Sequence, residues 1–246
     1  MDKRYSLLGI PIHALTREEI VNLLVEFAAG VSARARSAFY VNAHCVNIAC
    51  EDAEYRDILN KADLVYAGGQ GIVWGARMLG MYFPERVNIM DFLDALAEKM
   101  RAAQTSLYLL GATQPVIKKA EQVLKAKGLR IVGARDGYFP IQDEPGIIKE
   151  INMLKPDILM VGMGVPKQEK WIYGHLPELR VNVCWGVGGA FDILAGRIKS
   201  APRWINRSGL EWLYLGLQDP KRLLARYLLG NPLFVYRLLR HRIKTI

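Results

Sequence analysis

Residues 158–171, ILMVGMGVPKQEKW, form the stretch that decides the fold. Four apolar residues predict a buried strand, Gly162 and Gly164 predict a tight turn after it, and Pro166 predicts the start of a helix. Polar side chains then fall at the carboxyl end of the strand: Lys167, Gln168 and Glu169. This order is typical of an open α/β sheet, in which ligands bind beyond the carboxyl ends of the strands.

The same alternation continues along the chain. Short apolar runs predict strands at 38–41, 64–67, 106–110, 130–133, 158–161 and 181–185. Helical patterns lie at 16–27, 54–61, 71–79, 91–102, 115–127, 145–154 and 167–173. Because strands and helices alternate, the sequence predicts an α/β protein with a parallel sheet flanked by helices.

Several predicted strands end in glycine, at Gly111, Gly162 and Gly188. A glycine at this point lets the backbone approach a phosphate, and the N-terminus of the following helix attracts negative charge. Ordinary turn chemistry explains each glycine equally well, and no segment matches a dinucleotide fingerprint or a Walker A loop. Three such turns on one sheet nevertheless predict a pocket of the nucleotide-binding type.

The bulk composition is that of a globular protein, with 51% hydrophobic and 23% charged residues in 246. Cys45, Cys50 and Cys184 have no metal-ligand spacing and are interpreted as reduced thiols. The N-terminal segment has too short an apolar run for a signal peptide. No run of about 18 apolar residues predicts a transmembrane helix.

The tail, residues 203–246, is the basic element of the chain. It carries a formal +7 of the total +9, opposed only by Glu211 and Asp219. Its basic residues are Arg203, Arg207, Lys221, Arg222, Arg226, Arg237, Arg240, Arg242 and Lys244. Leucines and aromatics alternate with them, which predicts amphipathic helices on an anionic membrane surface. Pro220 and Pro232 are predicted to divide the tail into short helices.

Other uses of the tail stay open. It could form a helical subdomain packed on the body, or a subunit interface of a homo-oligomer with its arginines in water. A basic tail also suits nucleic acid, but the chain has no recognition-helix, RNA-binding or zinc motif, so no nucleic-acid partner is predicted.

The segment Gly162-x-Gly164-x-Pro166-x-Gln168-Glu169-x-Trp171 resembles the signature of the WecG/TagA/CpsF glycosyltransferases. Further segments resemble that family in order and spacing from about residue 5 to residue 234. They are Pro84-Glu85-Arg86-Val87 with Asp91, Gly186-Val187-Gly188 with Phe191-Asp192 and Ala195-Gly196, Ala201-Pro202-x-Trp204, Gly209-Leu-Glu-Trp-Leu-Tyr214, and Asp219-Pro220-x-Arg222.

The resemblance implies a Rossmann-like α/β domain over residues 1–200, with a membrane-docking helical appendage over residues 201–246. It implies an inverting transferase that moves a sugar from a UDP-sugar to a sugar on a polyprenyl diphosphate. In the best-known members the donor is UDP-N-acetylmannosamine and the acceptor is undecaprenyl-diphosphate N-acetylglucosamine, while related members use glucose or glucuronic acid donors. It also implies peripheral attachment to the cytoplasmic face of the bacterial plasma membrane, in cell-wall or exopolysaccharide synthesis.

No Asp-x-Asp pair, the usual clamp for a metal-bound nucleotide diphosphate, occurs in the sequence, so no metal and no cofactor are expected. Arginines, amides and helix N-termini would then stabilise the charge on departing UDP. Arg86 and Gln168, with Arg222 by resemblance, are the predicted catalytic residues. A solvated or lipid-facing role is the alternative for the tail arginines Arg222 and Arg226. The predicted substrate-binding residues are Asn42, Gly68, Gly69, Gln70, Gly111, Gly162, Gly164, Lys167, Glu169, Gly188, Asp192 and Arg226.

The chain departs from the family at the base, the group that takes the proton of the acceptor hydroxyl. The family places an aspartate where this chain has Gly68, and a threonine where it has Tyr40. The substitute bases weighed here are Asp91, Glu85 and His44. The alternatives are different chemistry, a non-catalytic homologue that binds a lipid-linked glycan or a partner enzyme, and a soluble nucleotide-binding enzyme that oligomerises through its tail.

Overall fold

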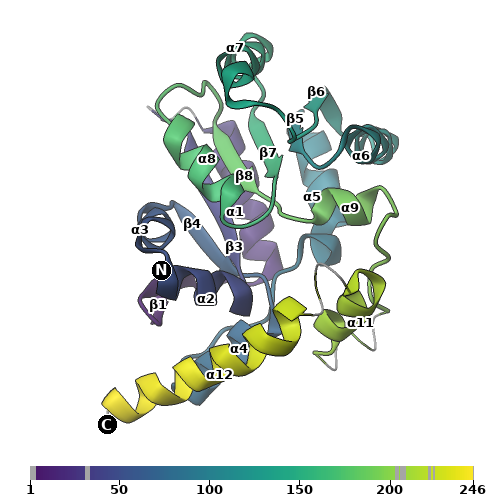
Figure 1. The fold of residues 1–246 in the computed structure, drawn as a ribbon. Helices are drawn as coiled ribbons and strands as arrows, with labels where there is room; N and C mark the ends of the chain where they lie inside the picture. The colour runs from purple at the N-terminus through teal and green to yellow at the C-terminus, as the bar shows by residue number, and fades with distance from the viewer. Residues whose placement is uncertain are drawn as a thin grey trace. The chain divides into compact units, whose positions relative to one another are not determined.

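A computed structural model describes residues 4–30, 34–202, 205, 209–220, 223 and 225–245. They form an α/β protein whose helices flank a mostly parallel sheet, as the sequence predicts (Figure 1). The chain divides into two compact units. One comprises Met1–Arg17, Tyr40–Asn88 and Ile198–Ile246, and the other comprises Glu18–Phe39 and Ile89–Arg197. The predicted division at residue 200 stays a prediction.

The first unit holds an N-terminal hairpin, two strands and the C-terminal helices. Its elements are β1 (Arg4–Leu7), β2 (Ile10–His13), the end of β3 (Arg36–Val41), α2 (Ala43–Glu51), α3 (Ala53–Lys61), β4 (Leu64–Ala67), α4 (Gln70–Met78), α11 (Glu211–Gln218) and α12 (Ala225–Thr245). The β1–β2 hairpin was not predicted, because four-residue strands show too little alternation to be recognised. Its two-residue turn, Leu8 and Gly9, has φ values of 52° and 82°, and glycine suits such a turn.

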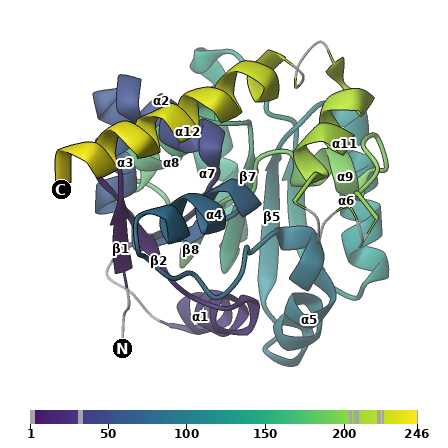
Figure 2. The ribbon, with the colours of Figure 1, turned by 90° about the horizontal axis from the view of Figure 1, so that it is seen from below.

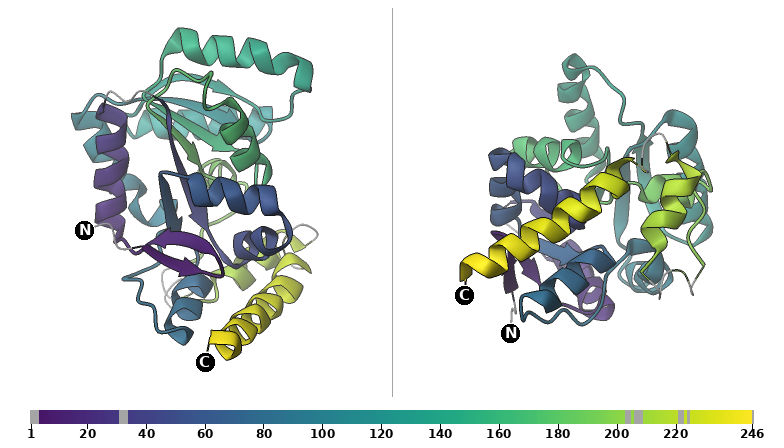
Figure 3. Two further views of the ribbon diagram at one scale, coloured as in Figure 1. Left: turned by 90° about the vertical axis from the view of Figure 1, so that its left-hand side faces the viewer. Right: turned by 60° about the horizontal axis from the view of Figure 1, so that its bottom comes forward.

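The expectation that Pro232 ends a helix is wrong. Pro232 lies inside α12, which runs unbroken from Ala225 to Thr245. A proline inside a helix removes one hydrogen bond and costs about 3 kcal/mol. Packing offsets this cost, since α12 lies along α2 and α4 (Figure 2, Figure 3). Its Phe234 and Leu238 side chains are buried. The Asn47 side chain of α2 also donates to the Gly230 carbonyl at 2.7 Å.

The second unit holds the glycine-ended strands. Its elements are α1 (Arg17–Ala29), the start of β3, α5 (Ile89–Ala102), β5 (Ser106–Gly111), α6 (Gln114–Ala126), β6 (Arg130–Arg135), η1 (Ile141–Asp143), α7 (Glu144–Leu154), β7 (Ile158–Gly162), α8 (Lys167–His175), β8 (Val183–Gly186) and α9 (Ala190–Leu194). Every residue of β5, β7 and β8 is buried. Their continuous apolar runs are typical of parallel strands covered on both faces.

The strand order is β1-β2-β4-β3-β8-β7-β5-β6. The β1–β2 pair is antiparallel, and the other described pairings are parallel. Strand β7 pairs with both β5 and β8, with Gly111 opposite Gly162. The carboxyl ends of these three strands therefore meet at one edge of the sheet. No helix in the described part of the chain is both long and apolar enough to span a bilayer.

Candidate functional site

The turns after β5, β6 and β7 pack backbone against backbone. Gly111 has a φ of 145°, and a Cβ there would lie 2.4 Å from the Gly162 carbonyl oxygen. A Cβ at Gly137 would lie 2.9 Å from the Gly111 Cα. No side chain fits at these positions, so close packing already accounts for Gly111 and Gly162. Gly164 differs, because its φ is 82° and a Cβ would meet no described atom within 4 Å. Among these glycines, open space for a ligand is found at Gly164.

Gln168 and Glu169 form a buried polar chain in the first turn of α8. The Gly188 N–H donates to Gln168 Oε1 at 2.9 Å, and Gln168 Nε2 donates to Glu169 Oε1 at 2.8 Å. Both side chains are completely buried. In this arrangement they hold the turn after β8, where Gly188 has a φ of 54°. Their predicted contacts with substrate stay predictions.

Glu169 is a carboxylic acid in an apolar setting. Its second oxygen, Oε2, is buried and has no hydrogen-bond partner in the part of the chain that the structure describes. Burial raises the pKa of Glu169 to about 8, against a weaker opposing effect of the hydrogen bond from Gln168. At neutral pH the side chain is therefore mostly protonated, since desolvation disfavours the charged form.

Lys167 and Asp192 of the same unit differ in burial, because Asp192 is buried. Lys167 is exposed, and its Nζ donates to the Gly137 carbonyl at 3.2 Å and lies 5.8 Å from the centre of the Phe139 ring. It ties the start of α8 to the loop after β6 and leaves a cation at the sheet edge. Asp192 pairs with Arg197, with 2.6 Å between Oδ1 and Nε.

In the first unit, the turns after β3 and β4 touch each other. Asn42 caps α2, and its Oδ1 accepts from the backbone N–H groups of His44 and Cys45 at 3.0 and 3.1 Å. A Cβ at Gly69 would lie 2.9 Å from the Asn42 Cβ. A Cβ at Gly68 would lie 2.8 Å from Tyr40 Cδ2. Tyr40 therefore fills the space that a side chain at position 68 would need.

The three substitute bases differ in how far they are already engaged. Glu85 accepts from the Arg17 backbone N–H at 2.9 Å and pairs with the Arg17 Nε at 2.5 Å. Asp91 lies in the first turn of α5 and has an interaction partner of its own. His44 is half-buried, and its ring makes no hydrogen bond or ion pair in the described residues. Burial, and then the positive charge of Arg226, lower the pKa of His44 to about 4. Its imidazole is therefore neutral at physiological pH.

Arg86 is held by the C-terminal segment. This arginine is buried and forms an ion pair with Glu211, whose other oxygen accepts from Asn88 Nδ2 at 3.0 Å. Neither Glu211 nor Asn88 was among the predicted site residues, although Glu211 is one of only two acids in the basic tail. The proposed contact of Arg86 with a diphosphate stays a prediction.

Of the two tail arginines predicted to act at the site, Arg226 lies in the described part of α12. Arg226 has its Nε buried without a hydrogen-bond partner in the described chain, and its guanidinium lies 5.2 Å from the centre of the Tyr227 ring. Arg222 lies outside the described residues. Gln70 begins α4, where the N-cap Gly69 leaves the backbone N–H groups without a side-chain cap. The described residues contain no cluster of three His, Cys, Asp or Glu side chains suited to a metal ion.

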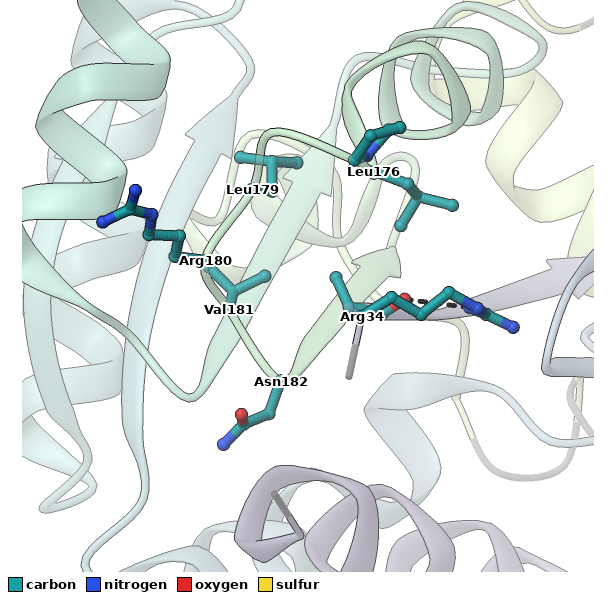
Figure 4. A pocket seen from close by; sticks show the side chains of 8 residues that line it. Arg34, Leu176, Leu179, Arg180, Val181 and Asn182 are labelled. Atoms are coloured by element: carbon teal, nitrogen blue, oxygen red, sulfur yellow. Dashed lines mark hydrogen bonds between the residues drawn. The ribbon is translucent and has the colours of Figure 1, made fainter. Parts of the chain in front are cut away.

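A cavity of about 410 Å³ lies in the second unit at the amino ends of β3 and β8, away from the glycine turns. Figure 4 shows its lining, in which the guanidinium groups of Arg34 and Arg180 point away from each other. Leu179 and Val181 line it between them. Because the two charges do not converge, the cavity lacks the focused positive charge of a diphosphate site.

Comparison with known proteins covers nearly the whole chain. The sequence model of the Glycosyl transferase WecG/TagA/CpsF family matches residues 5–246. Similar proteins include the N-acetylglucosaminyldiphosphoundecaprenol N-acetyl-beta-D-mannosaminyltransferases of Staphylococcus aureus strains MW2, NCTC 8325 / PS 47 and MRSA252. Each is 30% identical over 236 residues, which are 96% of this chain and 92% of the relative. The order of the motifs, the α/β fold and this match together show that the chain belongs to the WecG/TagA/CpsF family of glycosyltransferases.

Proposed function

We propose that this protein transfers N-acetylmannosamine, or a related hexose, from a UDP-sugar to N-acetylglucosamine on undecaprenyl diphosphate. The observation that carries the proposal is the similarity, over 96% of the chain, to transferases whose name gives N-acetylmannosamine as the transferred sugar and N-acetylglucosaminyldiphosphoundecaprenol as the acceptor. In this reaction the acceptor hydroxyl attacks the anomeric carbon of the donor sugar. The bond from that carbon to the diphosphate oxygen breaks, and UDP leaves with the electron pair.

The second unit supplies features that suit the diphosphate of the donor. Gly164 has open space beside it, and the first turn of α8 follows directly. Lys167 provides an exposed cation at the same edge. Backbone N–H groups at a helix start and a nearby cation stabilise negative charge that develops on a leaving diphosphate. The proposed chemistry needs no metal ion.

The first unit supplies features that suit a lipid surface. One face of α12 is buried through Phe234 and Leu238. The rest of the helix exposes apolar side chains, namely Leu228, Leu229, Leu233, Val235, Tyr236, Leu239 and Ile243. Arg240 and Arg242 are exposed near its end. Apolar and cationic side chains on one exposed helix suit peripheral binding to an anionic membrane, which is where a lipid-linked acceptor resides. We place the enzyme on the cytoplasmic face.

The test is UDP release from a panel of UDP-sugars, with lipid-diphosphate N-acetylglucosamine in anionic liposomes and with EDTA in a parallel arm. Release with UDP-N-acetylmannosamine that requires the acceptor and persists in EDTA supports the proposal. The alternative is a non-catalytic homologue, which Gly68 in place of the family aspartate favours. This alternative is supported if the protein binds the lipid-linked acceptor but releases no UDP from any donor of the panel.

A further inference from the structure

Inverting glycosyl transfer needs a group that accepts the proton of the attacking hydroxyl. Position 68 cannot provide one, because a side chain there would collide with Tyr40 at 2.8–3.2 Å. Glu85 is engaged on both oxygens by Arg17. The proton acceptor must then be another group, and the carboxyl ends of β3 and β4 hold one in the same unit.

His44 lies at that edge. It is the second residue of α2, which starts directly after β3, and its backbone N–H is fixed by the Asn42 cap at 3.0 Å. The same Asn42 packs against Gly69, the N-cap of α4. A Cβ at Gly71 would lie 3.7 Å from the Ala43 Cβ, so the first turns of α2 and α4 are in contact. His44 thus belongs to the paired turns that end β3 and β4.

Burial and a neighbouring charge keep the imidazole of His44 neutral. Burial is the larger cause, and the positive charge of Arg226 of α12 acts in the same direction, so that the pKa of His44 is lowered to about 4. Arg237 of α12 is occupied by the Asn47 carbonyl and Glu51. Other charged side chains on the neighbouring helices are Arg240 and Arg242, exposed near the end of α12, Arg77 near the end of α4, and Glu54, Arg56, Asp57 and Lys61 on α3. An anion bound by Arg226 would offset the positive charge that lowers the pKa of His44, and the imidazole would become more basic.

We propose that His44 is the catalytic base of this transferase, an assignment that rests on the proposed function. An imidazole nitrogen takes the acceptor hydroxyl proton while the oxygen bonds to the anomeric carbon and UDP departs. The imidazolium then returns its proton to solvent. Arg226 couples anion binding within the first unit to this base, because a negative charge held at Arg226 would make the imidazole of His44 more basic.

The experiment compares His44→Ala with the unaltered protein in the liposome assay, using the donor that the unaltered protein turns over. We expect kcat to fall about 10²- to 10⁴-fold with little change in KM for the donor. Added imidazole should restore part of the turnover, which a merely structural role would not allow. His175→Ala is the matched control, because His175 is a partly buried histidine paired with Glu144 in the second unit.

Each outcome decides the assignment. Two results overturn the role of His44 alone. In the first, the kcat of His44→Ala stays within about threefold of that of the unaltered protein. In the second, His44→Ala remains folded by circular dichroism but imidazole does not restore its turnover. If the unaltered protein releases no UDP with any donor of the panel, the proposed function is overturned, and the assignment of His44 with it. As a readout independent of turnover, Arg226→Gln should raise the pKa of His44 measured by NMR titration, and an unchanged pKa contradicts the coupling.

Discussion

Tyr40 and Gly68 show how two neighbouring turns share one small volume. The Tyr40 ring and Cβ lie where a side chain at position 68 would be, so the residue types at the two positions depend on each other. These are the two positions at which the sequence leads us to expect a departure from the family pattern, and in the structure they compete for the same space. Changing one of them without the other is therefore a poor test of whether an aspartate can act there.

We expect Gly68→Ala to destabilise the protein by about 1–3 kcal/mol, because overpacking forces neighbouring side chains away from their rotamers. Tyr40→Ala removes the ring contacts and leaves the Cβ contact. The double variant should therefore be about 1 kcal/mol more stable than the sum of the two single-variant effects on the free energy of unfolding predicts. Urea unfolding of the two single variants and the double variant measures the coupling. Additive effects would show that Tyr40 does not fill this space.

Glu169 gives a pH dependence opposite to that of most carboxyl groups. Its folded pKa is about 8 against a reference value of 4.5, so the folded state binds more protons between these values. The free energy of unfolding therefore falls as pH rises through this window, by about 3 kcal/mol at pH 7. Glu169→Gln cannot ionise, so its stability relative to the unaltered protein should grow from pH 5 to pH 8.

Urea unfolding at pH 5, 6.5 and 8 measures this difference. Glu98→Gln is the matched control, because Glu98 is an exposed carboxyl on α5. If the difference in the free energy of unfolding between Glu169→Gln and the unaltered protein is the same at all three pH values, Glu169 is ionised in the folded protein at neutral pH.

The C-terminal helices α11 and α12 are attached to the rest of the first unit through contacts between secondary-structure elements. Helix α12 approaches α4 at Gly75, where a Cβ would lie 2.6 Å from Leu238 Cδ1 and 3.0 Å from Phe234 Cζ. Helix α11 begins at Glu211, which pairs with Arg86. These contacts tie the tail to Tyr40–Asn88 within one unit. Hydrophobic packing and one buried ion pair therefore hold the helices that we propose to be membrane-binding.

Two glycines on α4 allow a matched test of the packing. In an exposed helix interior, glycine to alanine stabilises by up to about 1 kcal/mol. We expect Gly71→Ala to approach this gain, because its Cβ would make ordinary contacts at 3.7 and 3.9 Å. Gly75→Ala should instead lose about 1–2 kcal/mol by pushing Phe234 and Leu238 away. Equal effects in urea unfolding would argue against close packing of α12 on α4.

Two ion pairs allow a matched test of burial. Glu211 is 18% exposed and faces a buried arginine, whereas Glu51 is 66% exposed and pairs with Arg237. Removing one partner of a buried pair leaves an uncompensated charge and costs about 3–5 kcal/mol, and a surface pair is worth about 0–1 kcal/mol. Glu211→Ala should therefore destabilise the protein far more than Glu51→Ala. Similar costs by thermal unfolding would show that the other interactions of Arg86 compensate for the loss of Glu211.

At the scale of the whole molecule, the chain combines a nearly balanced body with a basic, apolar tail. Leu229 and Ile243 of α12 are each 75% exposed. We expect Leu229→Ser with Ile243→Ser to weaken binding to anionic liposomes several-fold without changing the fold, because apolar burial adds to the attraction of the arginines. Liposome co-sedimentation at two salt concentrations measures the change.

Met153→Ser is the control for this prediction, because Met153 is an equally exposed apolar side chain on α7, outside the tail. Apolar insertion should persist at high salt, whereas binding to nucleic acid falls steeply. Binding that vanishes at high salt for the unaltered protein, or that Met153→Ser weakens equally, would contradict a membrane-binding α12.

The strands and the glycine turns were predictable because their signals are local. The apolar runs of β4, β5 and β7 and the proline that precedes α8 can be recognised within about ten residues of sequence. The order of the motifs was enough to predict the family, and the match over residues 5–246 confirms it. The glycine turns were also correctly located, although for Gly111 and Gly162 the structure shows a packing reason.

Only the tertiary structure decided which residues distant in the sequence form ion pairs, pack against each other or become buried. Arg86 meets Glu211, 125 positions later, and α12 continues through Pro232 because α2 and α4 support it. Gln168 and Glu169 look like surface residues in the sequence but are buried beneath the turn after β8. Burial, ion pairing and steric exclusion all depend on non-local contacts, which a hydrophobic pattern of period two or 3.6 does not encode.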